Sequence, residues 1–268
     1  MLLPRVLTAI LGIPAILYIV YLGNLPYFLF ALALSALALY EYGLVLWVGG
    51  RGVQRVIAMI GGAGLCAAVA LSGPPFAGGP GLAELAVSAL VLAVMLRETL
   101  RREHSFDRAA VTLLGAFFIG WPLGHLPLIR AAAHGEAWTY WLFAAVWASD
   151  TCAYFAGRVF GRHRIAQILS PKKTWEGAVG GTLGAFAVTF LARKFFLGFL
   201  SPAAAAVLAL LVAAMGQMSD AAQSLVKRAA GAKDSGAMLP GHGGVFDRMD
   251  SFLLLAPIVY WLQTLLGG

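Results

Sequence analysis

The chain of 268 residues contains few charged side chains, few acids and only two cysteines. Charged residues account for 12% of it, about half of the ~25% found in ordinary soluble domains, and this excludes a typical soluble globular domain. Cys66 and Cys152 both lie in apolar surroundings, so they indicate neither a disulfide framework nor a zinc site.

Sequence motifs of several large enzyme classes are also missing. There is no Gly-x-x-x-x-Gly-Lys-Ser/Thr, which excludes a P-loop protein, and no His-Glu-x-x-His of a zinc protease. The Gly-x-Ser-x-Gly elbow of serine hydrolases is absent. So is the Asp-Gly-x-x-Ala-Arg pattern of CDP-alcohol phosphotransferases.

What the chain has instead is long apolar runs. Hydrophobic residues make up 60% of it, the mean hydropathy is +0.83, and the runs are continuous rather than alternating, which favours helices over a transmembrane barrel. We therefore predict an all-α polytopic membrane protein of about nine transmembrane helices, forming a single integral membrane domain over residues 1–268, with eight or ten helices as open alternatives. The predicted spans are Val6–Leu22, Pro26–Val48, Val56–Leu71, Leu82–Leu96, Ala109–Ile129, Trp138–Phe155, Gly177–Leu191, Pro202–Met218 and Phe252–Leu266.

The distribution of positive charge predicts the orientation of these spans. Sixteen of the 19 Lys and Arg residues fall in the connectors of one side, whereas the other side has only Arg130, Arg193 and Lys194. Because cytoplasmic loops carry an excess of Lys and Arg, we expect a multi-pass protein of the cytoplasmic (inner) membrane with its N-terminus and polar loops in the cytoplasm. The net charge of +7 is then a topology signal with attraction to anionic lipid, and we expect no nucleic-acid partner.

Three connectors of this side hold residues capable of chemistry. Residues 97–108 mix charges without a recognisable spacing and are interpreted as a solvated connector that touches lipid head groups. The second connector begins with Asp150, a carboxylate near a helix end that is costly unless it is paired or faces water. It continues to Ser170-Pro-Lys172-Lys173-Thr, two lysines beside hydroxyls at the expected start of a helix, where phosphate oxygens bind well. Ion pairing of Asp150 with Arg158 or Arg162, and lysines that only set topology, are the structural alternatives.

The third connector, residues 219–250, is the most polar stretch of the chain. Asp220 lies at the expected end of the eighth span, and Asp247 and Asp250 are three apart, on one face if the segment is helical. Hard oxygen ligands in a basic setting suit Mg²⁺ bound together with phosphates. Lys227 and Lys233 can neutralise phosphate, and Gly241-His242-Gly-Gly lets backbone N–H groups approach an anion.

Elsewhere, Glu41 and His125 lie inside spans and are interpreted as structural, each satisfied by a partner in the bundle.

The order of residues from Ser224 to Asp250 resembles the signature of phosphatidate cytidylyltransferases, also called CDP-diacylglycerol synthases. That signature combines Ser, Lys-Arg, Lys-Asp, Pro-x-His-Gly-Gly and Asp-Arg-x-Asp at fixed spacing, and every element is present here. Asp150-Thr-Cys-Ala-Tyr154 and Ser170-Pro-Lys-Lys-Thr-Trp-Glu-Gly177 are similar to the family's other marks, which gives a catalytic region of residues 147–250. One position departs from the family: Gln223 stands where a carboxylate is usual, so metal binding is expected to be weaker or to depend more on Asp247 and Asp150.

The resemblance implies the reaction of CTP with phosphatidate to give CDP-diacylglycerol and pyrophosphate, on the cytoplasmic face of the membrane. It implies Mg²⁺ as cofactor, leaves a second, monovalent ion open, and is compatible with a homodimer among the membrane lipids. The residues expected to act in catalysis are Asp220, Asp247, Lys227 and His242. Those expected to bind substrate are Ser170, Lys172, Lys173, Ser224, Arg228, Lys233, Asp234, Gly243, Gly244 and Arg248. Those expected to bind metal, directly or through a neighbour, are Asp220, Asp247, Asp150 and Asp250.

Two other functions remain open on the residues alone. A transporter of an anionic metabolite would also use acids, lysines and broken helices, although it predicts an inverted repeat that the sequence does not show. A related enzyme that uses another nucleotide or a polyprenyl phosphate would satisfy the same charge requirements, and only the signature disfavours it.

Overall fold

The computed structural model describes residues 3–73, 81–166, 170–236, 238 and 243–266. Most of these residues are helical, and the sheet described among them is one short two-stranded hairpin. The packing divides the chain into two compact units, Met1–Ala131 with Val226–Met249, and Ala132–Leu225 with Asp250–Gly268. Each unit is described in turn.

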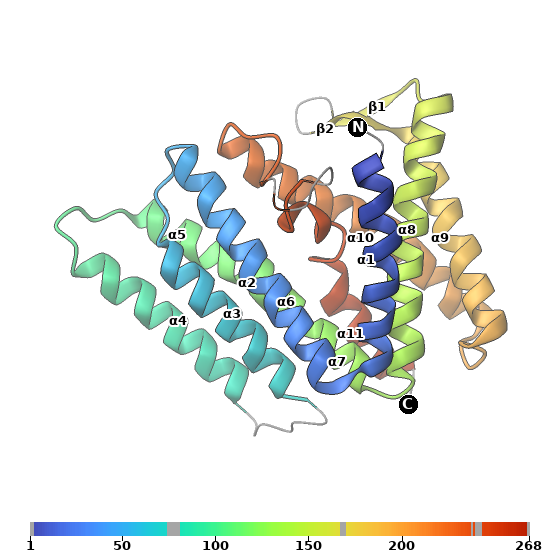
Figure 1. Cartoon of the computed structure of the whole chain (residues 1–268), viewed down its shortest axis with the longest axis horizontal. Helices are drawn as coiled ribbons and strands as arrows, with labels where there is room; N and C mark the ends of the chain where they lie inside the picture. Colours follow the sequence, from blue (N-terminus) through green and yellow to red (C-terminus); the bar gives the residue numbers. More distant parts are fainter. Residues whose placement is uncertain (1–2, 74–80, 167–169, 237, 239–242, 267–268) are drawn as a thin grey trace. The chain divides into compact units, whose positions relative to one another are not determined.

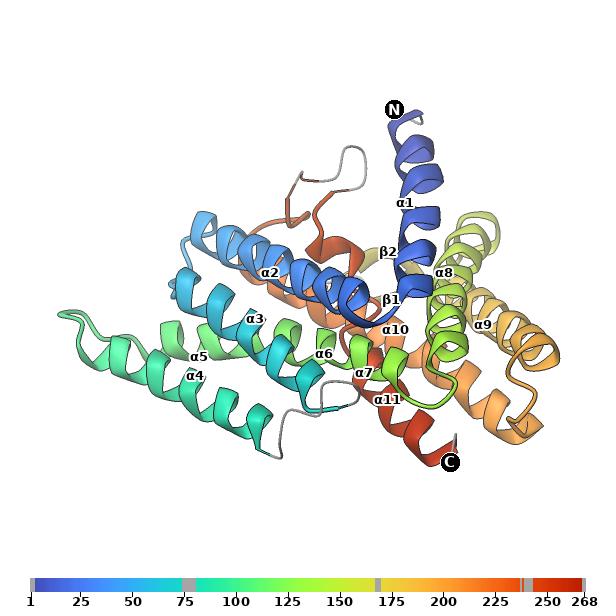
Figure 2. The same cartoon turned by 60° about the horizontal axis from the view of Figure 1, so that its bottom comes forward.

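The first unit consists mainly of consecutive helices, which Figure 1 labels along the chain. Its elements are α1 (Leu3–Leu22), α2 (Asn24–Val48), α3 (Arg55–Leu71), α4 (Leu82–Thr99), α5 (Phe106–Gly115), the π-helical segment η1 (Ala116–Gly120), α6 (Trp121–Leu123), α7 (His125–Ala131), the last residues of α10 and the 3₁₀ helix η2 (Phe246–Arg248). Figures 1 and 2 show α2, α3 and α4 running side by side. The segment η1 also packs against α3. The core between them is formed by buried apolar side chains such as Leu39, Leu65 and Val94.

The second unit consists of α8 (Gly135–Phe160), strands β1 (Arg164–Ala166) and β2 (Ser170–Thr174), α9 (Trp175–Phe195), α10 (Pro202–Ala229) up to Leu225, and α11 (Leu255–Leu266). The antiparallel strands pair Arg164 with Thr174 and Ala166 with Ser170. Helices α8 and α9 lie side by side along their length, and the buried Trp141 Nε1 donates to Thr189 Oγ1 at 3.0 Å between them.

Glycine allows the close approach of α8 and α9. A Cβ added at Gly184 would lie 2.8 Å from Cys152 Sγ, and one at Gly181 would lie 3.0 Å from the carbonyl oxygen of Ser149. Small residues therefore serve the close packing of this helix pair.

Helices are present at each of the nine predicted spans, and the chain has the composition of a membrane protein. Three helical segments are long and apolar enough to cross a bilayer: Asn24–Val48, Phe106–Ala131 and Pro202–Ala229. Ile10–Leu22, Arg55–Leu71 and Leu255–Leu266 are shorter apolar helices. The structure extends the predicted eighth span to Ala229 and begins the last helix at Leu255 instead of Phe252.

Two cations on the sparsely charged side have local structural roles. Arg130 Nε donates to the carbonyl oxygen of Val20 at 2.8 Å, near the C-terminal end of α1. Arg193 Nε donates to the carbonyl oxygen of Leu200 at 2.7 Å. The terminal carbonyls of a helix lack intrahelical donors, so a nearby guanidinium can satisfy them.

Candidate active site

The signature stretch folds around the carboxylate of Asp247. This side chain lies in η2 and is 8% exposed. Its Oδ1 accepts a hydrogen bond from Lys227 Nζ at 2.6 Å. Its Oδ2 accepts from the backbone N–H and the hydroxyl of Ser235, at 2.8 and 2.9 Å, and from Gly244 N at 3.2 Å. Three residues of the signature stretch, up to 20 positions away in sequence, therefore converge on one carboxylate.

These bonds keep Asp247 ionised. Burial alone would raise the pKa of its carboxyl, but the hydrogen bonds from Lys227 and Ser235 and the charge of Lys227 outweigh burial and lower the pKa below its ordinary value. A buried ion pair is tolerated only where further hydrogen bonds satisfy the remaining polar atoms, and Ser235 and Gly244 supply them here.

Glu41 of α2 supports the same stretch. It is 1% exposed. Its Oε2 accepts from Phe246 N at 2.9 Å and lies 3.0 Å from Ser235 Oγ, whose single proton it shares with Asp247 Oδ2. The prediction that Glu41 is satisfied by a partner in the bundle is met only for Oε2, and that partner is the signature loop; Oε1 has no hydrogen-bond partner among the described residues. The sequence signal was available: a lone carboxylate in a 25-residue apolar helix is costly without a partner.

The paired glycines of the signature serve this packing. Gly243 has φ +83°, a backbone conformation that favours glycine. A Cβ added at Gly244 would collide with Glu41 Oε2 and Ser235 Oγ, and one at Gly236 would lie 2.8 Å from Glu41 Oε1. The anion that the Gly244 N–H approaches in this structure is the carboxylate of Asp247.

Charged signature residues around this network face the solvent. Lys233, Asp234, Arg228 and Arg248 are exposed, and Arg228 Nη1 also donates to the carbonyl oxygen of Ala232 at 3.1 Å. Because Lys227 is committed to Asp247, the exposed cations are the side chains best placed to receive a phosphate from solution. His242 lies outside the described residues, and its predicted role stays a prediction.

In the second unit, Asp220 and Lys173 form a partly exposed pair. Lys173 Nζ lies 2.6 Å from Asp220 Oδ2, with side chains 25% and 28% exposed, and it also donates to the carbonyl oxygen of Gln217 at 3.3 Å. Ser224, one turn further along α10, donates to Asp220 Oδ1 at 3.4 Å. Three residues that the sequence selected from separate motifs are thus brought together.

Asp150 and Asp250 both lie near Ser251. Ser251 Oγ is 3.3 Å from Asp150 Oδ2, and Ser251 N donates to Asp250 Oδ1 at 2.8 Å. The helix η2 ends at Arg248, so Asp247 and Asp250 do not share a helical face. The conditional prediction from their three-residue spacing is therefore not met.

The lysines of the second motif lie on a strand rather than in a helix. Ser170, Lys172 and Lys173 belong to β2, and α9 begins at Trp175, where Thr174 Oγ1 accepts from Gly177 N at 3.1 Å as an N-cap. The expectation that this stretch lies at the start of a helix is met, because Thr174 is the N-cap of α9; the strand that carries the two lysines was not predicted. Lys172 is exposed.

Gln223, which stands where the family usually has a carboxylate, is buried. Gln223 is 0% exposed on α10, and the neighbouring Ser219 is also buried, with its Oγ accepting from Leu254 N at 3.2 Å. Within the described residues no group of three His, Cys, Asp or Glu side chains comes close enough to hold a metal ion without other ligands.

Comparison with known proteins assigns the class. The model of the cytidylyltransferase family matches residues 3–266, so the chain belongs to this family of nucleotidyltransferases.

Its curated relatives specify the family further. A phosphatidate cytidylyltransferase of Staphylococcus haemolyticus is 31% identical over 263 residues, 95% of this chain and 96% of the relative. One of Bacillus subtilis is 28% identical over 97% of both chains. One of Brucella suis is 43% identical over 150 residues, 54% of each chain. The resemblance predicted from the signature is confirmed, and an enzyme rather than a transporter is the class that follows.

Proposed function

We propose that this chain is a phosphatidate cytidylyltransferase, which transfers CMP from CTP to phosphatidate and releases CDP-diacylglycerol and pyrophosphate. One observation carries the proposal at the level of the structure. The family signature is organised as a site, with Lys227, Ser235 and Gly244 converging on Asp247, while its remaining cations stay exposed to receive a ligand.

The chemistry asks mainly for charge neutralisation. A phosphate oxygen of phosphatidate attacks the α-phosphorus of CTP, a new P–O–P bond forms, and the bond to the leaving pyrophosphate breaks. Both reactants are anions, so cations that hold the phosphates in line lower the barrier more than proton transfer would. Arg228, Lys233 and Arg248 are assigned to phosphates of CTP, and Lys172 and Lys173 to pyrophosphate or the lipid head group.

Mg²⁺ is part of the proposal, and the donors present fit it. The ion favours hard oxygen ligands and is usually held by one or two carboxylates together with substrate phosphates. Asp247 Oδ1 has one described donor, Lys227, and keeps a lone pair for a metal. Asp220 is the other proposed ligand, and the family signature adds Asp150 and Asp250 as direct ligands or neighbours of the ion. When bound, the ion would neutralise phosphate charge.

The membrane arrangement is proposed in its finer form as well. We expect about nine spans in the cytoplasmic membrane, with the N-terminus and the signature loops on the cytoplasmic side, where CTP is available. The excess of Lys and Arg in the connectors of one side supports this orientation. Assembly as a homodimer and the absence of a nucleic-acid partner remain predictions.

The direct test is formation of labelled CDP-diacylglycerol from CTP and phosphatidate by the purified full chain in detergent. We expect activity with CTP, none with ATP, and a requirement for Mg²⁺ that excess chelator removes. Pyrophosphate release without any closed compartment would distinguish the enzyme from a transporter. Equal rates with ATP and CTP, or full activity after chelation, would overturn the corresponding part of the proposal.

A further inference from the structure

The connector between α4 and α5 borders a basic pocket that the proposed reaction does not use. The pocket has a volume of about 620 Å³ and lies where the ends of α2, α3, α4 and α5 meet within the first unit. Four arginines line it: Arg55, Arg97, Arg101 and Arg108. Its described lining contains no carboxylate, and two aromatic side chains, Tyr40 and Trp47, complete it.

Only part of this positive charge is compensated. Arg108 pairs with the buried Glu98, whose oxygens also accept from Gln54 Nε2 and Ser105 N, at 2.8 and 2.7 Å. Within the described residues, no side-chain hydrogen bond or ion pair engages the guanidinium of Arg97 or Arg101, and both side chains are exposed.

The position of Arg55 also indicates that the pocket binds an anion. It is the first residue of α3, the positive end of the helix dipole, where a cation is disfavoured unless a negative group is near. Its guanidinium carbon lies 5.2 Å from the centre of the Trp47 ring, a cation–π contact that holds it at the pocket. Arg55, Arg97 and Arg101 line the same pocket, and guanidinium groups bind the oxygens of a phosphate well.

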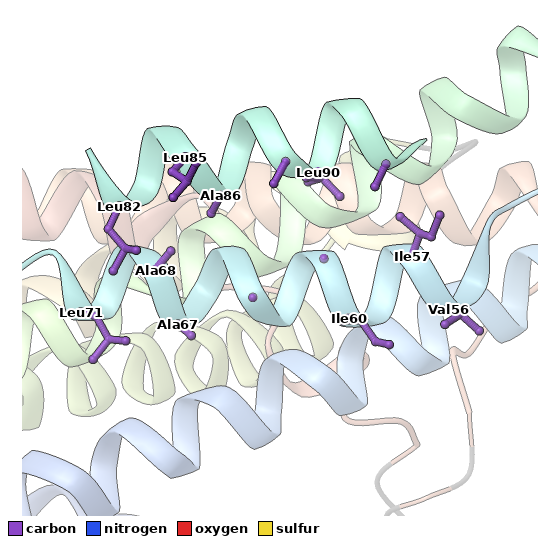
Figure 3. Close-up of a pocket in the computed structure, with 14 residues that line it drawn as sticks. Val56, Ile57, Ile60, Ala67, Ala68, Leu71, Leu82, Leu85, Ala86 and Leu90 are labelled. Carbon is purple, nitrogen blue, oxygen red and sulfur yellow. The ribbon is translucent and has the colours of Figure 1, made fainter. Parts of the chain in front are cut away.

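An apolar groove begins where the basic pocket ends. It has a volume of about 500 Å³, and its described lining residues come from α3 and α4 (Figure 3). Val56 belongs to both cavities, and Ala93 of the groove is one helical turn before Arg97. Small residues such as Gly64 and Ala89 keep the groove open. From Val56 to Leu71 the groove follows α3 for about 22 Å at 1.5 Å per residue, which exceeds the ~15 Å half-thickness of a bilayer core.

We infer that the pocket and the groove together bind one anionic glycerophospholipid, with its phosphate on Arg55, Arg97 and Arg101 and one acyl chain between α3 and α4. Charge complementarity selects the anionic head group, and the continuity of the basic and apolar parts selects a lipid over a soluble phosphate. Trp47 and Tyr40 have the amphipathic character of residues at the head-group level. The connector at residues 97–108 then contributes to a defined lipid site instead of touching head groups at random.

The neighbouring helix α2 connects this site with the signature loop. Tyr40 lines the basic pocket, whereas the next residue, Glu41, is buried against Ser235 and Phe246. Successive residues of a helix point in directions about 100° apart, so one turn of α2 serves both places. A lipid seated in the pocket thus contacts the helix that carries Glu41.

Native mass spectrometry of the purified full chain with phosphatidylglycerol or phosphatidylcholine, without CTP, tests the inference. We expect one phosphatidylglycerol molecule to be retained and phosphatidylcholine to be lost. Arg97→Gln with Arg101→Gln should weaken retention about tenfold or more, and the corresponding lysine variants should keep most of it. Arg102→Gln is the matched control, because Arg102 is exposed in the same connector and does not line the pocket.

The groove has its own pair of variants. Ala89→Phe should weaken retention by filling the groove, whereas Ser88→Phe, at an exposed neighbouring position outside the lining, should not. Soluble glycerol phosphate should fail to displace the lipid at equal concentration. Equal retention of both lipids, equal effects of Arg102→Gln and of Arg97→Gln with Arg101→Gln, or an unaffected Ala89→Phe variant would overturn the inference. Because phosphatidylglycerol binding is measured without turnover, its failure is distinguishable from failure of the proposed cytidylyltransferase reaction.

Discussion

Two lysine–aspartate ion pairs of the catalytic region have the same N–O distance but differ in how far they are exposed to solvent. Lys227 Nζ and Asp247 Oδ1 are 2.6 Å apart with side chains 11% and 8% exposed, and Lys173 Nζ and Asp220 Oδ2 are also 2.6 Å apart but 25% and 28% exposed. Desolvation makes the buried pair depend on its extra hydrogen bonds. Water reaches the other pair, so its partners can be exchanged at little cost. We conclude that the first pair holds the loop in shape, and that the second is suited to open for a substrate phosphate or a metal ion.

The largest expected effect comes from breaking the buried pair. Asp247→Ala leaves Lys227 buried without its counter-charge, which costs about 3–5 kcal/mol of unfolding free energy. Thermal unfolding in detergent should show a marked loss of stability, together with loss of CDP-diacylglycerol formation. In Asp247→Leu combined with Lys227→Met, stability should recover only in part, because the backbone N–H groups of Ser235 and Gly244 lose their acceptor, and activity should not recover. If Asp247→Ala is as stable as the wild type, the loop does not depend on this pair.

Breaking the exposed pair should separate activity from stability. Asp220→Ala and Lys173→Ala should each lower the rate roughly 100-fold, the scale on which a group that stabilises reacting phosphates acts. The free energy of unfolding should change by less than about 1 kcal/mol. The same assays used for Asp247 measure both quantities. A loss of stability as large as that of Asp247→Ala would remove the distinction between the two regions.

The contrast also explains what could be predicted from sequence. Helix positions followed from apolar runs, and Asp220, Lys227 and Asp247 followed from the signature, because both depend on local order along the chain. The partners of these residues did not follow. Glu41 is 194 residues from Ser235, and pairing at that separation is set by the packing of α2 and η2. The strand at Lys172 and Lys173 was missed because the capping hydroxyl of Thr174 places the start of α9 after the lysines.

A smaller effect is expected at Glu41, which supports the loop without belonging to the signature. Glu41→Gln keeps one acceptor oxygen but removes the charge that receives hydrogen bonds from Ser235 and Phe246. Unfolding free energy should fall by about 1–3 kcal/mol. We expect kcat to fall about 10- to 30-fold with KM for CTP little changed, because the variant shifts the loop and leaves the side chains that bind CTP in place. Glu41→Ala should be worse in both respects. A rise in KM for CTP with kcat unchanged would instead assign Glu41 to substrate binding.

The smallest effect is expected from restoring the carboxylate at Gln223. This side chain is fully buried on α10 three residues after Asp220, a spacing that places both on one helical face. In Gln223→Glu without Mg²⁺, the added buried charge should lower the unfolding temperature. Added Mg²⁺ should raise the unfolding temperature again. The Mg²⁺ concentration for half-maximal stabilisation should be about three- to tenfold lower in this variant than in the wild type, because the new carboxylate lies beside the proposed ligand Asp220. Asp220→Asn in the same background should abolish the shift. An unfolding temperature insensitive to Mg²⁺ in Gln223→Glu would exclude this face of α10 as a metal-binding surface and leave Asp220 with its lysine pairing alone.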